Sequence, residues 1–287
     1  MKKFSLLLIL IFTMLVGCSS NDASTGGDSK DVTIKFGVTP WTSTVPPTKV
    51  AKLLLEDMGY KVEETNADAG GVYTGLSRGD LDVFMDAWLP VMHANYMEQF
   101  GDSIASTSVS YLDGELGWVI PTYVEGIDTV EDLIGNEDLF DGKLYSIEEG
   151  AGMTMTSREM IEELGLDLEV VPSSEGGMLA QAQRMMANEE PVLFLGWRPH
   201  PMFANYDLKV LPSPEGFFDT SEVHVITNND LKEKAPDAYE FLSKWSMNVS
   251  DIEEMIVQIE DEGRDAEEVA QEWIDNNQDE VKAMTGK

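Results

Sequence analysis

Residues 32–59 read VTIKFGVTPWTSTVPPTKVAKLLLEDMG, and this stretch contains the two periodicities that decide the fold. From Val32 to Val38, apolar and polar residues alternate, as they do in a strand with one buried face. Pro46-Pro47 then opens a run with apolar residues at helical spacing, which Gly59 ends. The stretch therefore predicts a strand followed by a helix, which is one unit of an α/β protein.

The same alternation continues along the chain to about Asp230, after which the pattern is wholly helical. Strands are predicted at residues 61–65, 81–85, 116–120, 143–147, 168–171, 192–195 and 223–227. Helices are predicted at residues 72–77, 90–100, 154–164 and 177–187. Strands and helices in alternation favour mainly parallel sheets with helices on both faces.

The composition indicates a folded and strongly acidic protein. The chain has 287 residues, of which 43% are hydrophobic, and this suffices for about two domains. With 19 basic and 53 acidic residues its net charge is -34, so it would repel the phosphate backbone of a nucleic acid. A single cysteine allows neither an internal disulfide nor a thiolate metal cluster. The large negative charge therefore excludes nucleic acid as a partner.

The N-terminus is typical of an exported lipoprotein. Two lysines precede an apolar run from Phe4 to Val16, which is too short for a membrane span but suits a signal peptide. The run Leu15-Val16-Gly17-Cys18 resembles the bacterial lipobox, in which the cysteine is lipidated and becomes the first mature residue. We expect a signal peptide over residues 1–17 and a lipid-anchored tether over residues 18–30, which places the protein at the outer face of the cell membrane. The alternative is a buried cysteine behind an ordinary secretory signal.

One serine motif lacks the context that its chemistry requires. Residues 75–79 read GLSRG and match a nucleophile elbow around Ser77. The elbow needs a strand before the serine and a helix after it, and here the order is reversed. A lipoprotein hydrolase that uses Ser77 is therefore the weaker alternative, and we do not expect an enzyme.

Neither a metal nor a nucleotide cofactor is predicted. His93, His200 and His224 lack the spacing and the cysteine partners of a metal site, although a metal-binding lipoprotein stays open as an alternative. No glycine-rich phosphate loop is present in the sequence. Asp86 carries no predicted role.

The placement of four tryptophans is the most informative feature. Trp41, Trp88 and Trp197 each follow a predicted strand, whereas Trp118 lies inside one. Ligands of open α/β sheets bind outside the carboxyl ends of the strands, so three indoles lie where a ligand is expected. Trp118 is either a fourth wall of that site or a core residue. Several indoles without a catalytic group suit a quaternary ammonium ion, which donates no hydrogen bond and is recognised by aromatic faces.

At these residues the sequence resembles the extracytoplasmic glycine betaine and choline binding proteins of ABC importers. The matching segments are residues 37–60, 73–102, 116–123, 147–153 and 192–211. The resemblance implies the type II architecture of periplasmic binding proteins, in which two α/β lobes close on the ligand and one lobe is discontinuous. We place one lobe at residues 31–119 plus 222–287 and the other at residues 120–221.

The resemblance also implies the ligand site and the partners. The aromatic box of the choline-preferring branch corresponds to Trp41, Trp88 and Trp197, and that branch has tyrosine where this chain has Trp118. We expect a monomer without a cofactor that binds glycine betaine, or alternatively choline, proline betaine or carnitine, and delivers it to a permease subunit.

A betaine carboxylate needs hydrogen-bond donors, and two sets are available. Ser43 and Thr44 lie between a strand and a helix, where hydroxyl and N–H groups form an anion site. His200 is the second candidate, with a loop-capping role as its alternative. The choline-preferring branch has an acidic residue at the position of Ser43, so we expect this chain to prefer glycine betaine.

Overall fold

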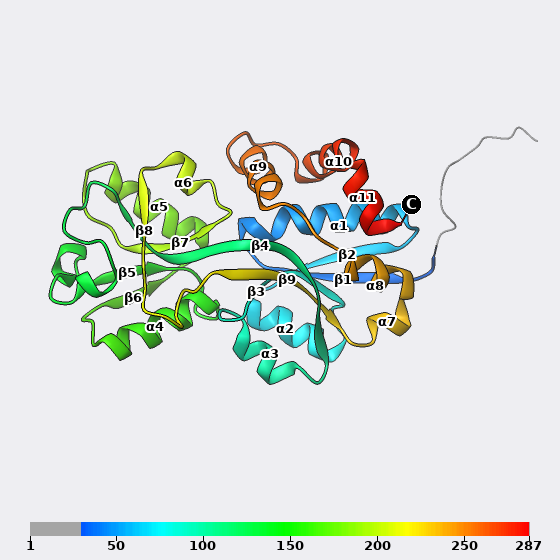
Figure 1. Cartoon of the computed structure of the whole chain (residues 1–287), viewed down its shortest axis with the longest axis horizontal. Coiled ribbons are helices and arrows are strands. Elements are labelled where there is room, and N and C mark those ends of the chain that lie inside the picture. Colours follow the sequence, from blue (N-terminus) through cyan, green and yellow to red (C-terminus); the bar gives the residue numbers. More distant parts are fainter. Residues whose placement is uncertain (1–29, 287) are drawn as a thin grey trace, which may run out of the picture.

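Two groups of strands, joined through one long strand, form the centre of the molecule (Figure 1). This computed structural model describes residues 30–286. The strand order is β2-β1-β3-β9-β4-β7-β5-β6, and β8 pairs with β4 beside this path. The α/β class predicted from the alternation is confirmed.

The first sheet contains strands from both ends of the described chain. Its strands are β1 (Thr33–Val38), β2 (Lys61–Asn66), β3 (Val83–Leu89) and β9 (Ser221–Asn228). Its helices are α1 (Val45–Asp57), α2 (Ala69–Arg78), α3 (Ala94–Phe100), α7 (Leu231–Lys234), α8 (Pro236–Ser243), α9 (Val249–Glu260), α10 (Ala266–Asn276) and α11 (Gln278–Thr285), with a short 3-10 helix, η1 (Thr42–Thr44), before α1. Figure 1 shows α1, α9 and α10 on one face of this sheet and α2 and α3 on the other.

The second sheet is built from the middle of the chain. Its strands are β5 (Lys143–Ser146), β6 (Glu169–Pro172), β7 (Phe194–Arg198) and β8 (Leu208–Leu211). Its helices are α4 (Gly152–Leu164), α5 (Glu175–Met186) and α6 (Met202–Asn205), with the 3-10 helices η2 (Glu131–Leu133) and η3 (Glu137–Phe140). Helices α5 and α6 lie on one face and α4 on the other (Figure 1).

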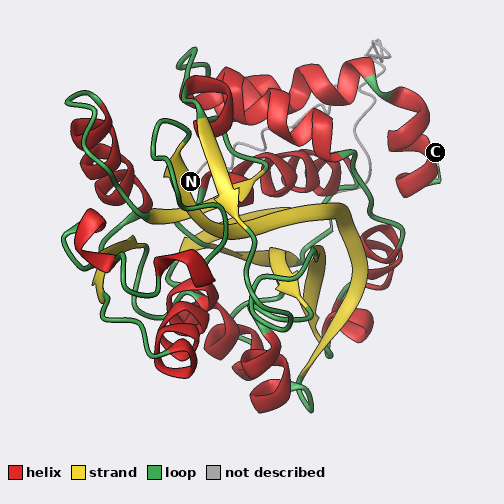
Figure 2. Ribbon diagram, turned by 60° about the vertical axis from the view of Figure 1, so that its left-hand side comes forward, coloured by secondary structure: helices red, strands yellow, loops and turns green. Residues whose placement is uncertain are grey.

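Strand β4 (Ile104–Pro121) belongs to both sheets, and Figure 2 shows it curving across the molecule. It pairs with β9 as far as Gly114 and with β7 from Glu115 onward. Both pairings are antiparallel, as are β3 with β9 and β4 with β8. The pairings of β1 with β2 and β3 and of β5 with β6 and β7 are parallel, so the sheets are mixed. The prediction of mainly parallel sheets is wrong at β4 and β9, whose pairings are all antiparallel. The lobe limits at residues 119/120 and 221/222 stay a prediction.

Two predicted strands extend further than expected, and this moves their tryptophans. Trp88 lies within β3 and Trp197 within β7, each at the carboxyl end of the strand. The strand predicted at residues 116–120 is only the end of β4, and β8 was not predicted. Among residues 30–286, no helix combines the length and the apolar character that a membrane span requires.

The core of the first sheet includes the two tryptophans of the C-terminal region. Trp245 is 2% exposed, meets Phe241 edge-on at 5.7 Å and donates its indole N–H to Ser110 Oγ at 2.9 Å. Trp273 is also buried and donates to Asp251 Oδ2 at 3.0 Å. Both side chains therefore act in packing.

We predict that Trp245→Ala lowers the free energy of unfolding by about 3–5 kcal/mol, because it leaves a large cavity and an unpaired Ser110 hydroxyl. Urea denaturation measures this loss. The affinity of the folded variant for its ligand should stay within about twofold of the wild type, since a change below ~0.5 kcal/mol is the norm at a distant site. A larger loss of affinity would contradict a packing role.

Candidate ligand-binding site

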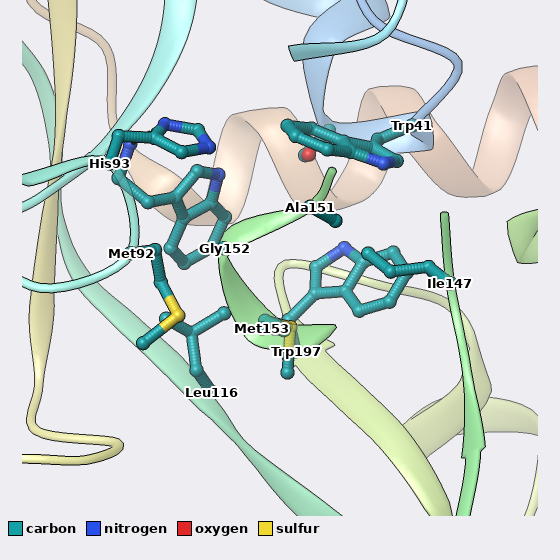
Figure 3. Close-up of a pocket in the computed structure, with 11 residues that line it drawn as sticks. Trp41, Met92, His93, Leu116, Ile147, Ala151, Gly152, Met153 and Trp197 are labelled. Atoms are coloured by element: carbon teal, nitrogen blue, oxygen red, sulfur yellow. Dashed lines mark hydrogen bonds between the residues drawn. The ribbon is translucent and has the colours of Figure 1, made fainter. Parts of the chain in front are cut away.

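A cavity lies where the carboxyl ends of strands from both sheets face each other (Figure 3). Its volume is about 330 Å³ including the open side. The lining residues are Trp41, Ser43, Trp88, Met92, His93, Leu116, Ile147, Ala151, Gly152, Met153 and Trp197. The wall is thus largely aromatic and aliphatic, with few polar side chains.

Three of the four predicted cage tryptophans meet at this cavity. Trp41, Trp88 and Trp197 are 7%, 4% and 3% exposed, so their rings are desolvated except where they face the cavity. Trp41 lies in the loop after β1, and the other two come from β3 and β7. All three positions lie at the carboxyl ends of strands, where ligands of open α/β sheets are expected.

Trp118 is not part of the cavity wall. Its side chain has no exposed surface and donates its indole N–H to Ser157 Oγ of α4 at 2.8 Å. Leu116, two residues earlier on the same face of β4, lines the cavity instead. Of the two alternatives left open for Trp118, its position in this structure corresponds to the core residue, because α4 covers it.

His93 completes the aromatic wall in place of Trp118. Its ring stacks on Trp41 with centroids 5.8 Å apart and planes inclined by 17°. Its Nδ1 accepts the backbone N–H of Trp88 at 3.1 Å, and burial lowers the pKa of His93 to about 3. The ring is therefore neutral and offers a π-face without a positive charge that would repel a cation. From its sequence context, His93 was predicted neither to line the site nor to have a partner in a metal site.

A buried carboxylate lies behind the wall of the cavity. Asp86 has no exposed surface and accepts hydrogen bonds from four side chains. They come from Ser43 at 2.8 Å and Thr44 at 2.8 Å on Oδ2, and from Trp88 at 3.1 Å and Tyr111 at 3.3 Å on Oδ1. Burial raises the pKa of Asp86 to about 6, against the opposing effect of these donors. Asp86 thus fixes the Trp88 indole and the Ser43 hydroxyl together.

The hydroxyl groups predicted to bind a carboxylate are already engaged. Ser43 lines the cavity, but its hydroxyl proton is donated to Asp86, and so is that of Thr44. The adjacent backbone N–H of Thr42 donates to Glu175 Oε2 at 3.1 Å. The expected anion site at this loop is therefore occupied by carboxylates of the protein itself.

His200 also lies outside the cavity wall. Its Nδ1 accepts the backbone N–H of Met202 at 2.9 Å, so Nε2 carries the proton of the neutral ring. That proton faces Glu175 Oε1 at 3.2 Å. His200 therefore orients Glu175, and its predicted role as a carboxylate ligand stays a prediction.

Free donors are found instead at the beginning of α4. This helix begins at Gly152 without a side-chain cap, and the first N–H groups of a helix have no partner within it. Gly152 and Met153 line the cavity. The indole N–H of Trp197 is buried there and has no partner among the described residues. This side of the cavity can receive an anion.

The two sheets are in contact around the cavity. Tyr96 donates its hydroxyl to the carbonyl of Gly150 at 2.8 Å, and Trp41 donates its indole N–H to Glu148 Oε2 at 3.2 Å. A Cβ atom on Gly152 would lie 2.1 Å from the Met92 carbonyl oxygen. The arrangement is therefore closed, and it requires glycine at position 152.

The sequence profile of the substrate-binding domain of ABC-type glycine betaine transport systems matches residues 32–276. This chain belongs to that family. The family consists of extracytoplasmic transport proteins rather than enzymes, and its architecture is that of two-lobe type II periplasmic binding proteins. We refer below to the lobes that carry the first and the second sheet.

Similar proteins of known identity bind compact quaternary ammonium compounds. The glycine betaine/carnitine transport binding protein GbuC of Listeria monocytogenes is 34% identical over 146 residues, which are 50% of this chain and 48% of that protein, so the match spans about half of its length. Lactococcal OpuAC, closed and complexed with glycine betaine, has a TM-score of 0.81 and 27% identity over 89% of this chain and 100% of that chain. An ABC-transporter choline binding protein in complex with choline has a TM-score of 0.82 and 27% identity over 88% of this chain and 91% of that chain.

Among the residues of the two alternative chemistries, His93 lines the cavity, whereas Ser77, His200 and His224 do not. Ser77 is part of α2 and donates its hydroxyl to the carbonyl of Thr74, so it is not on a strand-to-helix turn. His224 lies on β9 beside Glu222, away from His93 and His200. Within residues 30–286, no group of three side chains has the arrangement of a metal site.

We predict that Gly152→Ala weakens ligand binding by roughly tenfold, because overpacking against the Met92 carbonyl costs about 1–3 kcal/mol and hinders closure. Calorimetric titration measures the effect. The matched control is Gly176→Ala, in the first turn of α5, where an added Cβ has no neighbour within 4 Å. Equal losses in the two variants would contradict the close approach of the lobes.

Proposed function

We propose that this protein binds glycine betaine, or a closely related quaternary ammonium compound, and delivers it to the permease of an ABC importer. The observation that carries the proposal is a cavity with aromatic faces on one side and unpaired N–H donors on the other. A zwitterion with a trimethylammonium group and a carboxylate has the same two ends.

The cationic end fits the aromatic side. Trp41, Trp88 and Trp197 provide π-faces, and the neutral His93 ring extends the wall beside Trp41. Each face contributes ~0.5–2 kcal/mol to the binding of a cation, with the larger values where the site is dry. A trimethylammonium group donates no hydrogen bond, so the scarcity of acceptors in this wall carries no penalty for it.

The anionic end fits the beginning of α4. The N–H groups of Gly152 and Met153 and the positive end of the helix dipole favour a carboxylate at this place. The unpaired Trp197 indole N–H adds a donor on the same lobe. These groups replace Ser43, Thr44 and His200 as the proposed carboxylate site.

Choline is the second candidate, because the Ser43 oxygen at the cavity wall can accept a hydrogen bond from a hydroxyl group. Calorimetric titration with glycine betaine, proline betaine, choline and carnitine tests both candidates. Tightest binding of a betaine supports the first proposal and tightest binding of choline the second. Absence of binding by all four ligands would contradict both.

We further propose a hinge between the lobes at residues 31–119 plus 222–287 and residues 120–221. The two crossings lie on β4 and before β9, which begins at Ser221; the pairing of β4 changes from β9 to β7 at Gly114–Glu115, a few residues before the proposed limit at residues 119/120. A monomer of this type closes on the ligand by rotation about such crossings.

We predict that Trp41→Ala, Trp88→Ala and Trp197→Ala each weaken glycine betaine binding by about 1 kcal/mol or more, through lost cation–π attraction and lost enclosure. Calorimetric titration measures the losses. Trp273→Ala is the matched control, because this indole lies among the C-terminal helices and should affect stability alone. A control that loses as much affinity as the cage variants would place the site elsewhere.

We also propose that residues 1–17 are a signal peptide and that Cys18 carries a lipid; both lie outside the described residues. Cys18→Ala should release the protein from membranes, because the chain has no other cysteine. Fractionation of expressing cells measures the release, and ligand titration of the soluble variant checks its fold. Membrane association that survives the substitution would refute the anchor.

A further inference from the structure

The hydroxyl group of Ser43 presents only lone pairs to the cavity. A serine hydroxyl has a single proton, and Ser43 directs it to Asp86 Oδ2 at 2.8 Å. Ser43 is at the same time one of the residues that line the cavity. Toward a ligand, Ser43 is therefore an acceptor and not a donor.

The other donors to Asp86 explain why the Ser43 hydroxyl must direct its proton toward this carboxylate. The indole N–H of Trp88 can only donate, and it occupies Oδ1 together with the Tyr111 hydroxyl. Thr44 donates to Oδ2 and lies 2.5 Å from the Thr39 hydroxyl, which completes a chain of donors that ends on the carboxylate. An ionised Asp86 has no proton to give, so every hydroxyl around it must point inward.

We propose that Asp86 is a positioning residue that makes Ser43 a hydrogen-bond acceptor toward the ligand, so that the first lobe accepts a hydroxyl group and rejects a carboxylate. This inference rests on the proposed function and adds to it which end of the ligand faces each lobe. The carboxylate of a betaine is turned toward α4, and discrimination between betaine and choline depends on Asp86, which itself touches neither.

Replacement of Asp86 by asparagine reverses the network without changing its shape. The amide oxygen accepts from Trp88 and Tyr111, while the amide NH₂ donates to Ser43 and Thr44. Thr44 then donates to Thr39, and Ser43 turns its proton into the cavity. In Asp86→Asn, Ser43 becomes a donor that suits a carboxylate.

The experiment is a double-mutant cycle of Asp86→Asn and Ser43→Ala, with glycine betaine and choline titrated into each protein at about pH 8. We expect Asp86→Asn to shift the ratio of the two affinities toward betaine by at least about fivefold, because hydrogen bonds to charged groups are the strong ones. In the Ser43→Ala background the shift should fall to less than half. Asp251→Asn is the matched control, because this carboxylate also accepts an indole N–H. The ratio of the betaine and choline affinities of this variant should equal that of the wild type.

The outcomes separate the inference from the proposed function. If Asp86→Asn leaves the ratio of the betaine and choline affinities unchanged, the inference is overturned. It is also overturned if Asp86→Asn shifts this ratio equally in the presence and in the absence of the Ser43 hydroxyl, because the charge of Asp86 would then act without Ser43. Wild-type protein that binds neither ligand contradicts the proposed function instead.

A measurement without ligand tests the network in either case. The NMR signal of the Trp88 indole N–H, assigned through Trp88→Phe, should shift with pH near the Asp86 pKa of about 6 and should not shift in Asp86→Asn. The titratable neighbours are Tyr73 and Tyr111, whose pKa values burial raises, and His93, whose pKa burial lowers to about 3. None of them changes charge near pH 6, so a Trp88 signal that shifts equally in the wild type and in Asp86→Asn overturns the inference, because the shift would then not come from the Asp86 carboxylate.

Discussion

The site depends on the removal of one carboxylate from water. Asp86 has no exposed surface, and a buried charge is tolerated only when hydrogen bonds replace its hydration. Its donors come from η1, from β3 and from β4, so satisfying this single group fixes three separate elements relative to one another. The orientation of the Trp88 ring and the proton of Ser43 both follow from that requirement.

The two lobes offer opposite hydrogen-bonding character to the cavity. The first lobe has its hydroxyl protons committed to Asp86, whereas the second contributes the open N–H groups of α4 and the unpaired Trp197 indole. Glu175 of the second lobe meanwhile accepts the Thr42 N–H of the first. In the proposed function, a zwitterion between such surfaces would complete the pairing that neither lobe can make alone, which would couple ligand binding to closure.

The sequence predicted what depends on local pattern and could not predict what depends on packing. Strand ends are local features, so the positions of Trp41, Trp88 and Trp197 at one edge followed from periodicity alone. The depth of Trp118 depends on α4 lying over it, and the role of His93 depends on its stack with Trp41. The direction of the Ser43 proton depends on a carboxylate 43 residues away, which no spacing rule connects to it.

The net charge of -34 cannot itself select a betaine. The negative electrostatic field of the protein attracts a cation such as choline. A zwitterion has no net charge, so the field only orients it with its cationic end toward the protein. Short-range interactions with the carboxylate must therefore overcome the repulsion that the negative field of the whole protein exerts on it. Amide N–H groups do this only where water is excluded, because their small partial charges are strongly screened in solvent. The close approach of Gly152 to the Met92 carbonyl brings the lobes together beside those amides, so under the proposed function it is expected to serve selectivity as well as affinity.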